Sequence, residues 1–547
     1  LKLISVPKDL EILTIKGVRY IKVGWRNVPY NSKSYTIKDE TKVIAKNAFK
    51  GCRVLQSIVI PKGVAKIGSM AFNDCNNPTI TCESPLFNVG DGILYSKEGE
   101  LISCFSTSKD VVIPKDVTKI GECAFAWCSF LRTVVIPDSV TEIGGGAFRG
   151  CDYLQTIEIP NSVTEIGAYA FSECRSLRSI VIPNNVTKIK DSAFWSCSSL
   201  QTIEIPDSVT EIGGGSFSGC SSLRSIVIPN NVTKIRDSAF WSCSSLQTIE
   251  IPDSVTEIGG GSFSRCSSLR TIVIPNSVTK IEDRTFAGCG SLLSIEIPDS
   301  VQEIGWAVFD DCSSLQSIVI PDSVTKIGSS AFDGCSSLQT IVIPNGVTEI
   351  GGSTFWKCSS LQSIEIPDSV TKIGELAFHG CSSLQTIEIP DSVTEIEWGV
   401  FGDCTSLQSV KIPNGVTEVE SRTFEGCSSL QSIEILDSVT KIGYRAFCNC
   451  SSLQSIEIPN SVTEIRDWAF FSCSSLQSVE IPNGVTEIGE CTFHGCRSLH
   501  SIVIPDSVTK IGEAAFHGCR SLQSVKIPDS VIEIGDRAFE GCTSLNR

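Results

Sequence analysis

The sequence predicts a solenoid, a fold in which one short unit is stacked on copies of itself, and three repeating columns of residues support this. Cysteine recurs every 23 residues from Cys128 to Cys542. Phenylalanine stands three residues before each of these cysteines, and leucine stands three residues after. A fixed period of this kind indicates stacked units, each of which buries its apolar face only against its neighbours. A chain of 547 residues therefore need not divide into several globular domains.

Each unit is expected to begin with a short strand. Period-two alternation puts Ile157 and Ile159 on one face of such a strand, and Thr156 and Glu158 on the solvent face. Pro160 ends the strand because it has no N–H to give to a ladder. Stacked in register, these strands are expected to form one long parallel sheet that presents Ser or Thr together with Glu, Val or Lys.

The rest of the unit is expected to turn the chain back and to fill the core from the far side. The residues that do so in one unit are Val163, Ile166, Phe171 and Cys174. Cysteines one period apart lie on neighbouring coils, roughly 4.8 Å apart with parallel side chains, which fits disulfide geometry poorly. Each periodic cysteine is therefore interpreted as a small buried hydrophobe with a weak S–H donor. Among the cysteines outside the period, Cys82 and Cys104 are the pair best suited to a disulfide.

The repeat string I-P-x-S-V-T-x-I-G-x-x-A-F-x-x-C-x-S-L resembles the cysteine-bearing, 23-residue subclass of leucine-rich repeats found in BspA-like bacterial and protist surface proteins. The resemblance covers Tyr35 to Leu545. It implies an α/β-type solenoid, a right-handed arc with one long parallel sheet on the concave face. Short helical or 3-10 turns and loops are expected on the convex face.

Two segments depart from the period. Residues 1–34 lack it and are expected to form an N-terminal cap of short strands, before a solenoid of about 23 coils over residues 35–547. Residues 76–110 interrupt the solenoid. Within them, the segment from Phe87 to Lys97 predicts a hairpin with a Gly/Asp turn, and it resembles the interrupting hairpin unit of the same family.

Charges of alternating sign precede the second isoleucine of each repeat over much of the chain. They are Lys188, Glu211, Lys234, Glu257, Lys280, Glu303, Lys326, Glu349, Lys372 and Glu395. Opposite charges on adjacent rungs attract by a few tenths of a kcal/mol to about 1 kcal/mol per pair. The alternation is therefore interpreted as support for the register of the coils.

A second set of charges, on the expected sheet face, clusters toward the C-terminal end. The candidate binding residues there are Glu365, Glu388, Lys411, Glu434, Glu457, Glu480 and Lys526. Neighbouring carboxylates repel unless a cation lies nearby, so one interpretation is a site for a cation or a basic partner. The alternative is a hydrated acidic stripe screened by salt. The two lysines could equally anchor an acidic partner.

Six tryptophans at variable repeat positions are candidates for a second binding surface, on the side away from the sheet. Trp195, Trp241 and Trp356 follow the core phenylalanine, and Trp306, Trp398 and Trp468 precede it. An exposed indole can grip a sugar ring or a protein. The alternative is that each indole covers a neighbouring turn.

No catalytic, metal or cofactor site is expected. The chain has no phosphate-cradling loop and no nucleophile elbow. His494 and His517 fall on adjacent coils beside Cys491, whereas zinc needs three or four convergent ligands. The net charge of −16 argues against nucleic acid as a partner, and no apolar run approaches the roughly 20 residues of a membrane span.

Duplication favours an extended contact surface over a singular pocket. Residues 183–228 and 229–274 differ only at Lys190/Arg236, Gly219/Arg265 and Ser225/Thr271. Many weak contacts acting together give multivalent affinity. The resemblance implies a non-enzymatic cell-surface or secreted adhesin that binds extracellular-matrix, host or microbial surface proteins. The alternatives are a structural protein that self-associates through its uncapped C-terminal coil, and an intracellular, cytoplasmic interaction scaffold.

Overall fold

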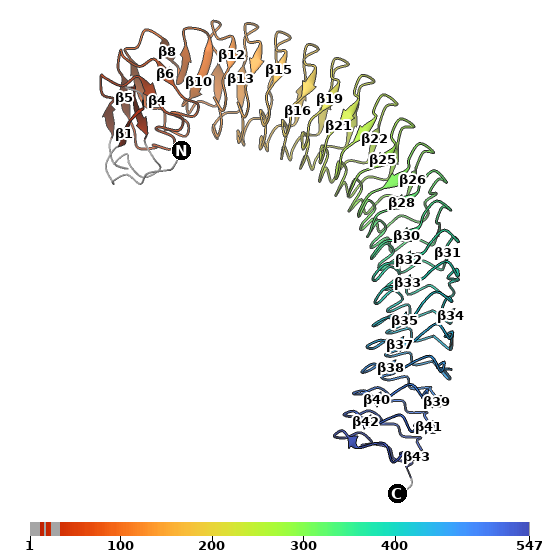
Figure 1. Ribbon diagram of the computed structural model, residues 1–547. Helices are drawn as coiled ribbons and strands as arrows, with labels where there is room; N and C mark the ends of the chain where they lie inside the picture. The colour runs from red at the N-terminus through yellow and green to blue at the C-terminus, as the bar shows by residue number, and fades with distance from the viewer. Residues whose placement is uncertain (1–10, 16–17, 23–32, 546–547) are drawn as a thin grey trace. The chain divides into compact units, whose positions relative to one another are not determined.

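The computed structural model describes residues 11–15, 18–22 and 33–545, and among these residues strands are the only regular elements. The chain divides into two units, Leu1–Leu269 and Arg270–Arg547, and both are built in the same way (Figure 1). Most regular coils supply a first short strand, a second strand of two residues and then a series of turns. The described residues make about 22 such turns.

The first strands of successive coils stack into what we call the first column. In the first unit it consists of β3 (Ser34–Thr36), β5 (Ser57–Ile60), β7 (Thr79–Cys82), β11 (Asp110–Val112), β13 (Thr133–Val135), β16 (Ser179–Val181), β18 (Thr202–Glu204), β20 (Ser225–Val227) and β22 (Thr248–Glu250). In the second unit it consists of β24 (Thr271–Val273), β26 (Ser294–Glu296), β29 (Thr340–Val342), β31 (Ser363–Glu365), β34 (Ser409–Lys411), β36 (Ser432–Glu434), β39 (Ser478–Glu480), β41 (Ser501–Val503) and β43 (Ser524–Lys526).

The two-residue strands stack into a second column. In the first unit these are β4 (Val43–Ile44), β6 (Lys66–Ile67), β12 (Lys119–Ile120), β14 (Glu142–Ile143), β15 (Glu165–Ile166), β17 (Lys188–Ile189), β19 (Glu211–Ile212), β21 (Lys234–Ile235) and β23 (Glu257–Ile258). In the second unit they are β25 (Lys280–Ile281), β27 (Glu303–Ile304), β28 (Lys326–Ile327), β30 (Glu349–Ile350), β32 (Lys372–Ile373), β33 (Glu395–Ile396), β35 (Glu418–Val419), β37 (Lys441–Ile442), β38 (Glu464–Ile465), β40 (Glu487–Ile488), β42 (Lys510–Ile511) and β44 (Glu533–Ile534).

Both columns are parallel and keep the 23-residue register of the sequence. Ile180 pairs with Ile203 in the first column, and Ile189 pairs with Ile212 in the second. Where no strand is assigned, isolated bridges such as Val135 to Glu158 continue the first column. The sequence led us to expect one sheet, but the Lys/Glu-Ile dipeptide also alternates between solvent and core and forms a ladder of its own.

The core of each unit is a stack of phenylalanine rings flanked by leucine, isoleucine, valine and cysteine. From Phe125 to Phe263 in the first unit, neighbouring ring centroids lie 4.9–5.5 Å apart with nearly parallel planes. From Phe286 to Phe539 in the second unit, they lie 5.2–5.8 Å apart. Identical side chains at one-coil spacing therefore fill the interior.

The periodic cysteines are buried thiols that donate hydrogen bonds, as the sequence predicted. The Cys151 Sγ donates to the Phe125 carbonyl oxygen of the preceding coil at 3.1 Å, and equivalent bonds of 3.1–3.3 Å recur as far as the bond from Cys542 to Phe516. Cys82 and Cys104 are also free thiols, not a disulfide. Each regular cysteine therefore links two successive coils.

The turns after the second strand are not helical, so the prediction of short helical or 3-10 turns is wrong for the described residues. Successive backbone N–H groups in these turns donate alternately to the next coil and to their own turn. The Phe171 N–H donates to Ala193 O of the next coil at 2.8 Å, whereas the Ser172 N–H donates to Tyr169 O of its own turn at 3.1 Å. A helix would need consecutive N–H groups to bond within the turn, and positive φ angles at Tyr169 and Glu173 also interrupt any helical run.

Residues 76–110 contain a hairpin in place of a regular coil. It is formed by β8 (Phe87–Gly90) and β9 (Ile93–Ser96), joined through a turn in which Asp91 and Gly92 both have positive φ. Next in the chain, β10 (Glu100–Cys104) pairs with β9 and with β12. The chain then runs to β11 without the usual series of turns.

A side chain compensates for the missing turns. The Asn73 Nδ2 donates to the carbonyl oxygens of Cys123 at 2.8 Å and Ala126 at 3.0 Å, and its Oδ1 accepts a hydrogen bond from the Ser103 hydroxyl at 2.8 Å. Asn73 is fully buried. It therefore bridges two regular coils on either side of the interruption.

The segment expected to be an N-terminal cap lies largely outside the described residues. Within it, β1 (Glu11–Ile15) and β2 (Val18–Lys22) pair in antiparallel fashion, and β2 pairs with β4 in parallel. Residues 1–10, 16–17 and 23–32 lie outside the described part. The capping role stays a prediction.

Candidate interaction surfaces

Outward side chains form three surfaces on each unit. We call the outward residues of the first column the strand face. The outward residues of the second column, with the residue that follows each of its strands, form the charged face, and the remaining residues up to the periodic cysteine form the turn face. Their chemistry differs because each repeat position is filled by its own set of residues. The three surfaces therefore have to be assessed separately as binding sites.

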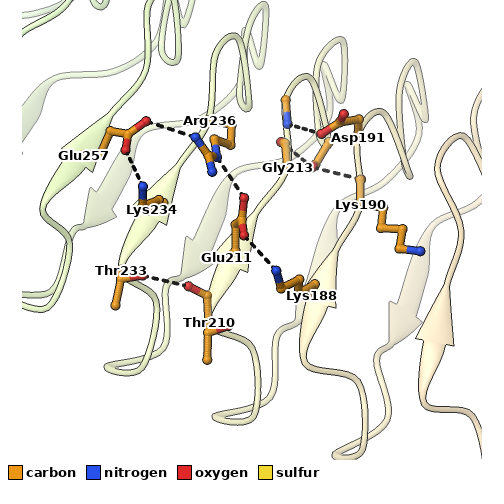
Figure 2. A network of polar contacts seen from close by, with 12 residues as sticks. Lys188, Lys190, Asp191, Thr210, Glu211, Gly213, Thr233, Lys234, Arg236 and Glu257 are labelled. Atoms are coloured by element: carbon orange, nitrogen blue, oxygen red, sulfur yellow. Dashed lines mark hydrogen bonds and ion pairs between the residues drawn. The ribbon is translucent and has the colours of Figure 1, made fainter.

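The charged face is a network of mutual ion pairs (Figure 2). Glu211 is bonded by Lys188 Nζ at 3.3 Å and by Arg236 Nε at 2.8 Å, and Glu257 is bonded by Arg236 Nη1 at 3.2 Å and by Lys234 Nζ at 2.9 Å. The hydrogen bond from Arg236 lowers the pKa of Glu211; burial opposes this, and the hydrogen bond from Lys188 adds to the lowering. These charges satisfy one another across neighbouring coils, which supports their interpretation as register-keeping groups.

The second unit repeats this arrangement on its own charged face. Lys326 bonds Glu303 at 2.9 Å, and Lys510 bonds Glu487 at 2.9 Å. Hydrogen bonds to two carboxylates, the stronger to Glu397, raise the pKa of the Lys372 ammonium. The charged face therefore offers few unpaired charges to a ligand.

The strand face of the first unit exposes a row of valines. Their exposed fractions are 68% for Val112, 57% for Val135, 59% for Val181 and 77% for Val227. Exposed glutamates occupy the same position in the intervening coils, namely Glu158, Glu204 and Glu250. Valine was expected here only as one of the solvent-facing residue types of the sheet, whereas these side chains form a row of exposed apolar groups.

Arginines on the same coils as the valines were missed from the sequence. Arg132, Arg178 and Arg224 begin the valine-bearing strand segments and are exposed, whereas the alternate coils carry glutamine at this position. None of the three arginines forms an ion pair with a residue in the described part of the chain. The signal that could have revealed them is a 46-residue period in which arginine and valine occur on the same coil.

The strand face of the second unit carries all seven charged residues that the sequence singled out, and all are exposed. Glu365 and Glu388 are direct neighbours across a bridge. Lys411 pairs with Glu434, and their Nζ and Oε1 atoms lie 3.9 Å apart. The remaining members occupy equivalent positions in their own coils: Glu457, Glu480 and Lys526. The geometry brings these residues into one row, and their role as a binding site stays a prediction.

Most of the tryptophans predicted as binding residues lie beneath cations of the turn face. The pairs, with the distance from the cationic centre to the ring centroid, are Arg265 over Trp241 at 5.5 Å, Arg284 over Trp306 at 4.2 Å, Lys357 over Trp356 at 4.0 Å and Arg445 over Trp468 at 5.0 Å. Such cation–π contacts favour the interpretation that these rings cover neighbouring turns. Trp195 and Trp398 are more than one-third exposed.

An aromatic and arginine cluster in the first unit was also missed. The Arg149 guanidinium lies 5.7 Å from the ring centroids of both Trp127 and Tyr169. It bonds Glu173, which is only 8% exposed and is also bonded by Arg175 Nη2 at 3.0 Å. These residues occupy variable repeat positions in different coils, so no sequence motif links them.

Stacked imidazoles mark the turn face near the end of the second unit. The rings of His494 and His517 lie 4.6 Å apart, and Phe471 stacks on His494 at 4.8 Å. Burial, followed by the neighbouring His517, lowers the pKa of His494. The Nδ1 atoms of both histidines are buried without a hydrogen-bond partner. Like charges at this separation would repel, which favours the neutral form of the His494 imidazole.

Neither a metal site nor a membrane span is found in the described part of the chain. No three His, Cys, Asp or Glu side chains there converge in a way that could hold a metal ion. Likewise, that part contains no helix with the length and apolar character needed to cross a bilayer.

Self-association through the C-terminal coil is not tested by the structure and stays a prediction.

The family model and the similar solved structures found by comparison are of leucine-rich repeat proteins. A model of the BspA-type leucine-rich repeat region matches residues 27–108, 102–213, 188–316, 302–431 and 417–546. A search of curated proteins finds no match. Among solved structures, a leucine-rich repeat protein from Bacteroides ovatus is 28% identical, over 82% of this chain and 97% of that one, with a TM-score of 0.43. A leucine-rich cell surface protein from Faecalibacterium prausnitzii is 28% identical, over 69% and 95%, with a TM-score of 0.37.

Proposed function

The chain belongs to the BspA-type leucine-rich repeat family, and we propose that it is a non-enzymatic cell-surface or secreted adhesin. Its partner is an extracellular-matrix protein or another cell-surface protein, and it is held by the strand face. Binding needs no cofactor and no catalytic residue. Affinity arises from repeated weak contacts along successive coils.

The observation that carries this proposal is the exposed valine row of the first unit. Isolated exposed apolar residues are common on soluble proteins, but a regular row on one sheet face is typical of an interaction surface. The backbone of the first column is already paired within the column, as in the ladder from Ser179 to Val181. The partner is therefore held by side-chain contacts and not by addition of a strand.

The charges on the strand face indicate what charge the partner surface carries. Unpaired arginines and glutamates alternate between coils in the first unit, so a partner with both signs of charge fits there. The second unit also exposes valines, and its charged residues are mainly carboxylates, which favour a basic partner surface. Electrostatic complementarity of this kind steers association and weakens with added salt.

The test uses the full-length chain and immobilised collagen, laminin and fibronectin, with binding followed by biolayer interferometry. The proposal predicts saturable binding to at least one of them, which weakens between 50 and 300 mM salt, roughly the range in which the Debye length falls below 10 Å. The variant Arg132→Gln/Arg178→Gln/Arg224→Gln introduces the residue of the alternate coils and is expected to associate more slowly.

A matched control keeps the same change of charge on a different surface. Lys188→Gln/Lys234→Gln/Lys119→Gln removes three cations from the charged face, where each is already ion-paired, and it should bind like the wild type. Absence of binding to all three matrix proteins would overturn the adhesin proposal. Equal loss in the two triple variants would show that net charge, not the strand face, governs binding.

A further inference from the structure

We propose that the turn face of the first unit holds a second site, which binds a neutral, extended glycan. Trp195 is the ring on which a sugar residue stacks, and Trp241 supplies a second ring. This site lies on a different surface from the strand face. It does not depend on the proposed recognition of a protein partner.

The two rings have a spacing that suits a linear repeating ligand. Trp195 and Trp241 follow the core residues Phe194 and Phe240, which are two coils apart. The two intervening ring-to-ring distances are 5.5 and 5.4 Å, so equivalent atoms of the two coils lie about 11 Å apart. The coil between them carries the buried Ser218 in place of tryptophan. An extended β-linked glycan can therefore place alternate sugar residues on the two rings.

Polar residues flank Trp195 in the chain. Ser192 and Ser196 are half-buried and carry hydroxyl groups, and Asp191 is exposed. The Asp191 carboxylate accepts a hydrogen bond from the Gly214 N–H at 2.8 Å, and Glu173 is held by two arginines. An aromatic face with hydroxyl groups and an exposed carboxylate in the same series of turns suits a neutral sugar and disfavours an anionic one. The C–H face of the sugar stacks on the ring while its hydroxyls form hydrogen bonds.

The duplicated coils provide an internal comparison. Arg265 lies over Trp241 with its guanidinium carbon 5.5 Å from the ring centroid. In the sister copy the equivalent residue is Gly219, so no guanidinium competes for the Trp195 ring. Both indoles are exposed to a similar extent, 37% for Trp195 and 36% for Trp241. The two sites therefore differ in the cation beside the ring more than in solvent access. We expect Trp195 to bind the glycan more tightly than Trp241 does.

A glycan fits this surface better than a protein does. Binding hot spots for proteins are aromatic residues enclosed by a ring of further contacts that excludes water. Trp195 instead stands among serine and glycine, which give little apolar area for a protein to cover. Stacking on isolated rings, repeated along the coils, is sufficient for a linear glycan.

Titration calorimetry of the full-length protein with cellohexaose and chitohexaose tests the proposal, and dextran serves as an α-linked comparison. At least one β-linked hexasaccharide should bind, and Trp195→Ala should weaken that binding about fivefold. Gly219→Arg should weaken it without removing the ring, since Arg265 shows that this position tolerates arginine. Arg265→Gly should strengthen it about twofold by freeing the second ring.

Controls separate the site from the rest of the molecule. Leu293→Ala, which removes an exposed apolar side chain of the second unit, should leave glycan binding unchanged. Thermal unfolding should show that Gly219→Arg and Arg265→Gly fold normally, because each carries the residue of its sister copy. No binding of either β-linked hexasaccharide at millimolar concentration would overturn the proposal. Wild-type glycan affinity in both Trp195→Ala and Gly219→Arg would also overturn it, as would loss of matrix-protein binding alone in these variants.

Discussion

At the scale of the residue, the periodic cysteine is a structural donor. Its thiol bonds a carbonyl oxygen of the preceding coil, and its burial places it among the stacked phenylalanines. Burial disfavours the thiolate and raises the pKa of Cys197 and of Cys243 to about 12. These thiols are therefore expected to resist alkylation and oxidation at neutral pH.

The raised thiol pKa values predict loss of stability in alkaline solution. Each buried thiol has a folded pKa above its ordinary value of 9.0, so the folded chain holds more protons than the unfolded chain between about pH 9 and 12. The stabilisation is complete below pH 9 and is lost as pH rises toward 12, by up to roughly 1.4 kcal/mol per pH unit for each such thiol. Urea unfolding at pH 7.5, 8.5 and 10 measures this, and Cys243→Ala should show a shallower decline. A free energy of unfolding that stays constant from pH 8.5 to 10 would contradict it.

Asp333 predicts that the stability of the fold also depends on pH in acidic to neutral solution. Burial, followed by repulsion from Asp310 and Asp311, raises its pKa to about 7. Its folded pKa exceeds the ordinary value of 3.8, so its stabilising contribution is present below pH 4 and is lost as pH rises to 7. Asp333→Asn should therefore raise the melting temperature at pH 8 and change little at pH 4. The exposed Asp322→Asn is the control, and an equal effect of both variants at pH 8 would exclude this assignment.

At the scale of the element, the period alone specifies most of the fold. Phe125 and its equivalents had to stack, and Cys151 and its equivalents had to be buried, because each column consists of one residue type at one-coil spacing. The register of the charged face was also predictable, since Lys188 and Glu211 carry opposite charges. The absence of helix was not predictable in the same way, because it depends on which N–H groups bond the next coil.

Other features could not be predicted from the sequence because they depend on contacts between distant residues. Asn73 looks like an ordinary turn residue, yet it bonds carbonyl groups about 50 residues away across the interruption. The cation beside Trp241 comes from the following coil. The exposed valine row was not singled out from the sequence, because its exposure depends on the whole column. Residues that differ from the repeat consensus, such as Asn73 and the cation beside Trp241, are therefore the hardest to assign from the sequence.

Removal of the Asn73 side chain tests how the interruption is bridged. Asn73→Ala leaves the carbonyl groups of Cys123 and Ala126 and the hydroxyl of Ser103 without this partner in a buried setting. The expected cost is about 3 kcal/mol in the free energy of unfolding. Asn76→Ala, at an exposed position nearby, should change the free energy by less than about 0.5 kcal/mol. If chemical denaturation gives equal values for the two variants, Asn73 is not the bridge.

At the scale of the whole molecule, repetition copies each outward surface from coil to coil, which favours an extended contact surface over a singular pocket. Charges of the second column largely neutralise one another and hold the coils in register. The first column leaves its valines and arginines free for a partner. Duplication of coils multiplies these contacts, so the affinity of the array should grow with the number of coils engaged.

Equilibrium binding of a cumulative valine series tests this account most directly. Val227→Thr, then Val181→Thr, Val135→Thr and Val112→Thr are added to the full-length chain. Threonine keeps the branched shape and suits a strand. Affinity for the bound matrix protein should fall by about twofold at each step, and by about tenfold or more in the quadruple variant, with unchanged thermal unfolding. Wild-type affinity in a folded quadruple variant would contradict the claim that the strand face is the binding surface.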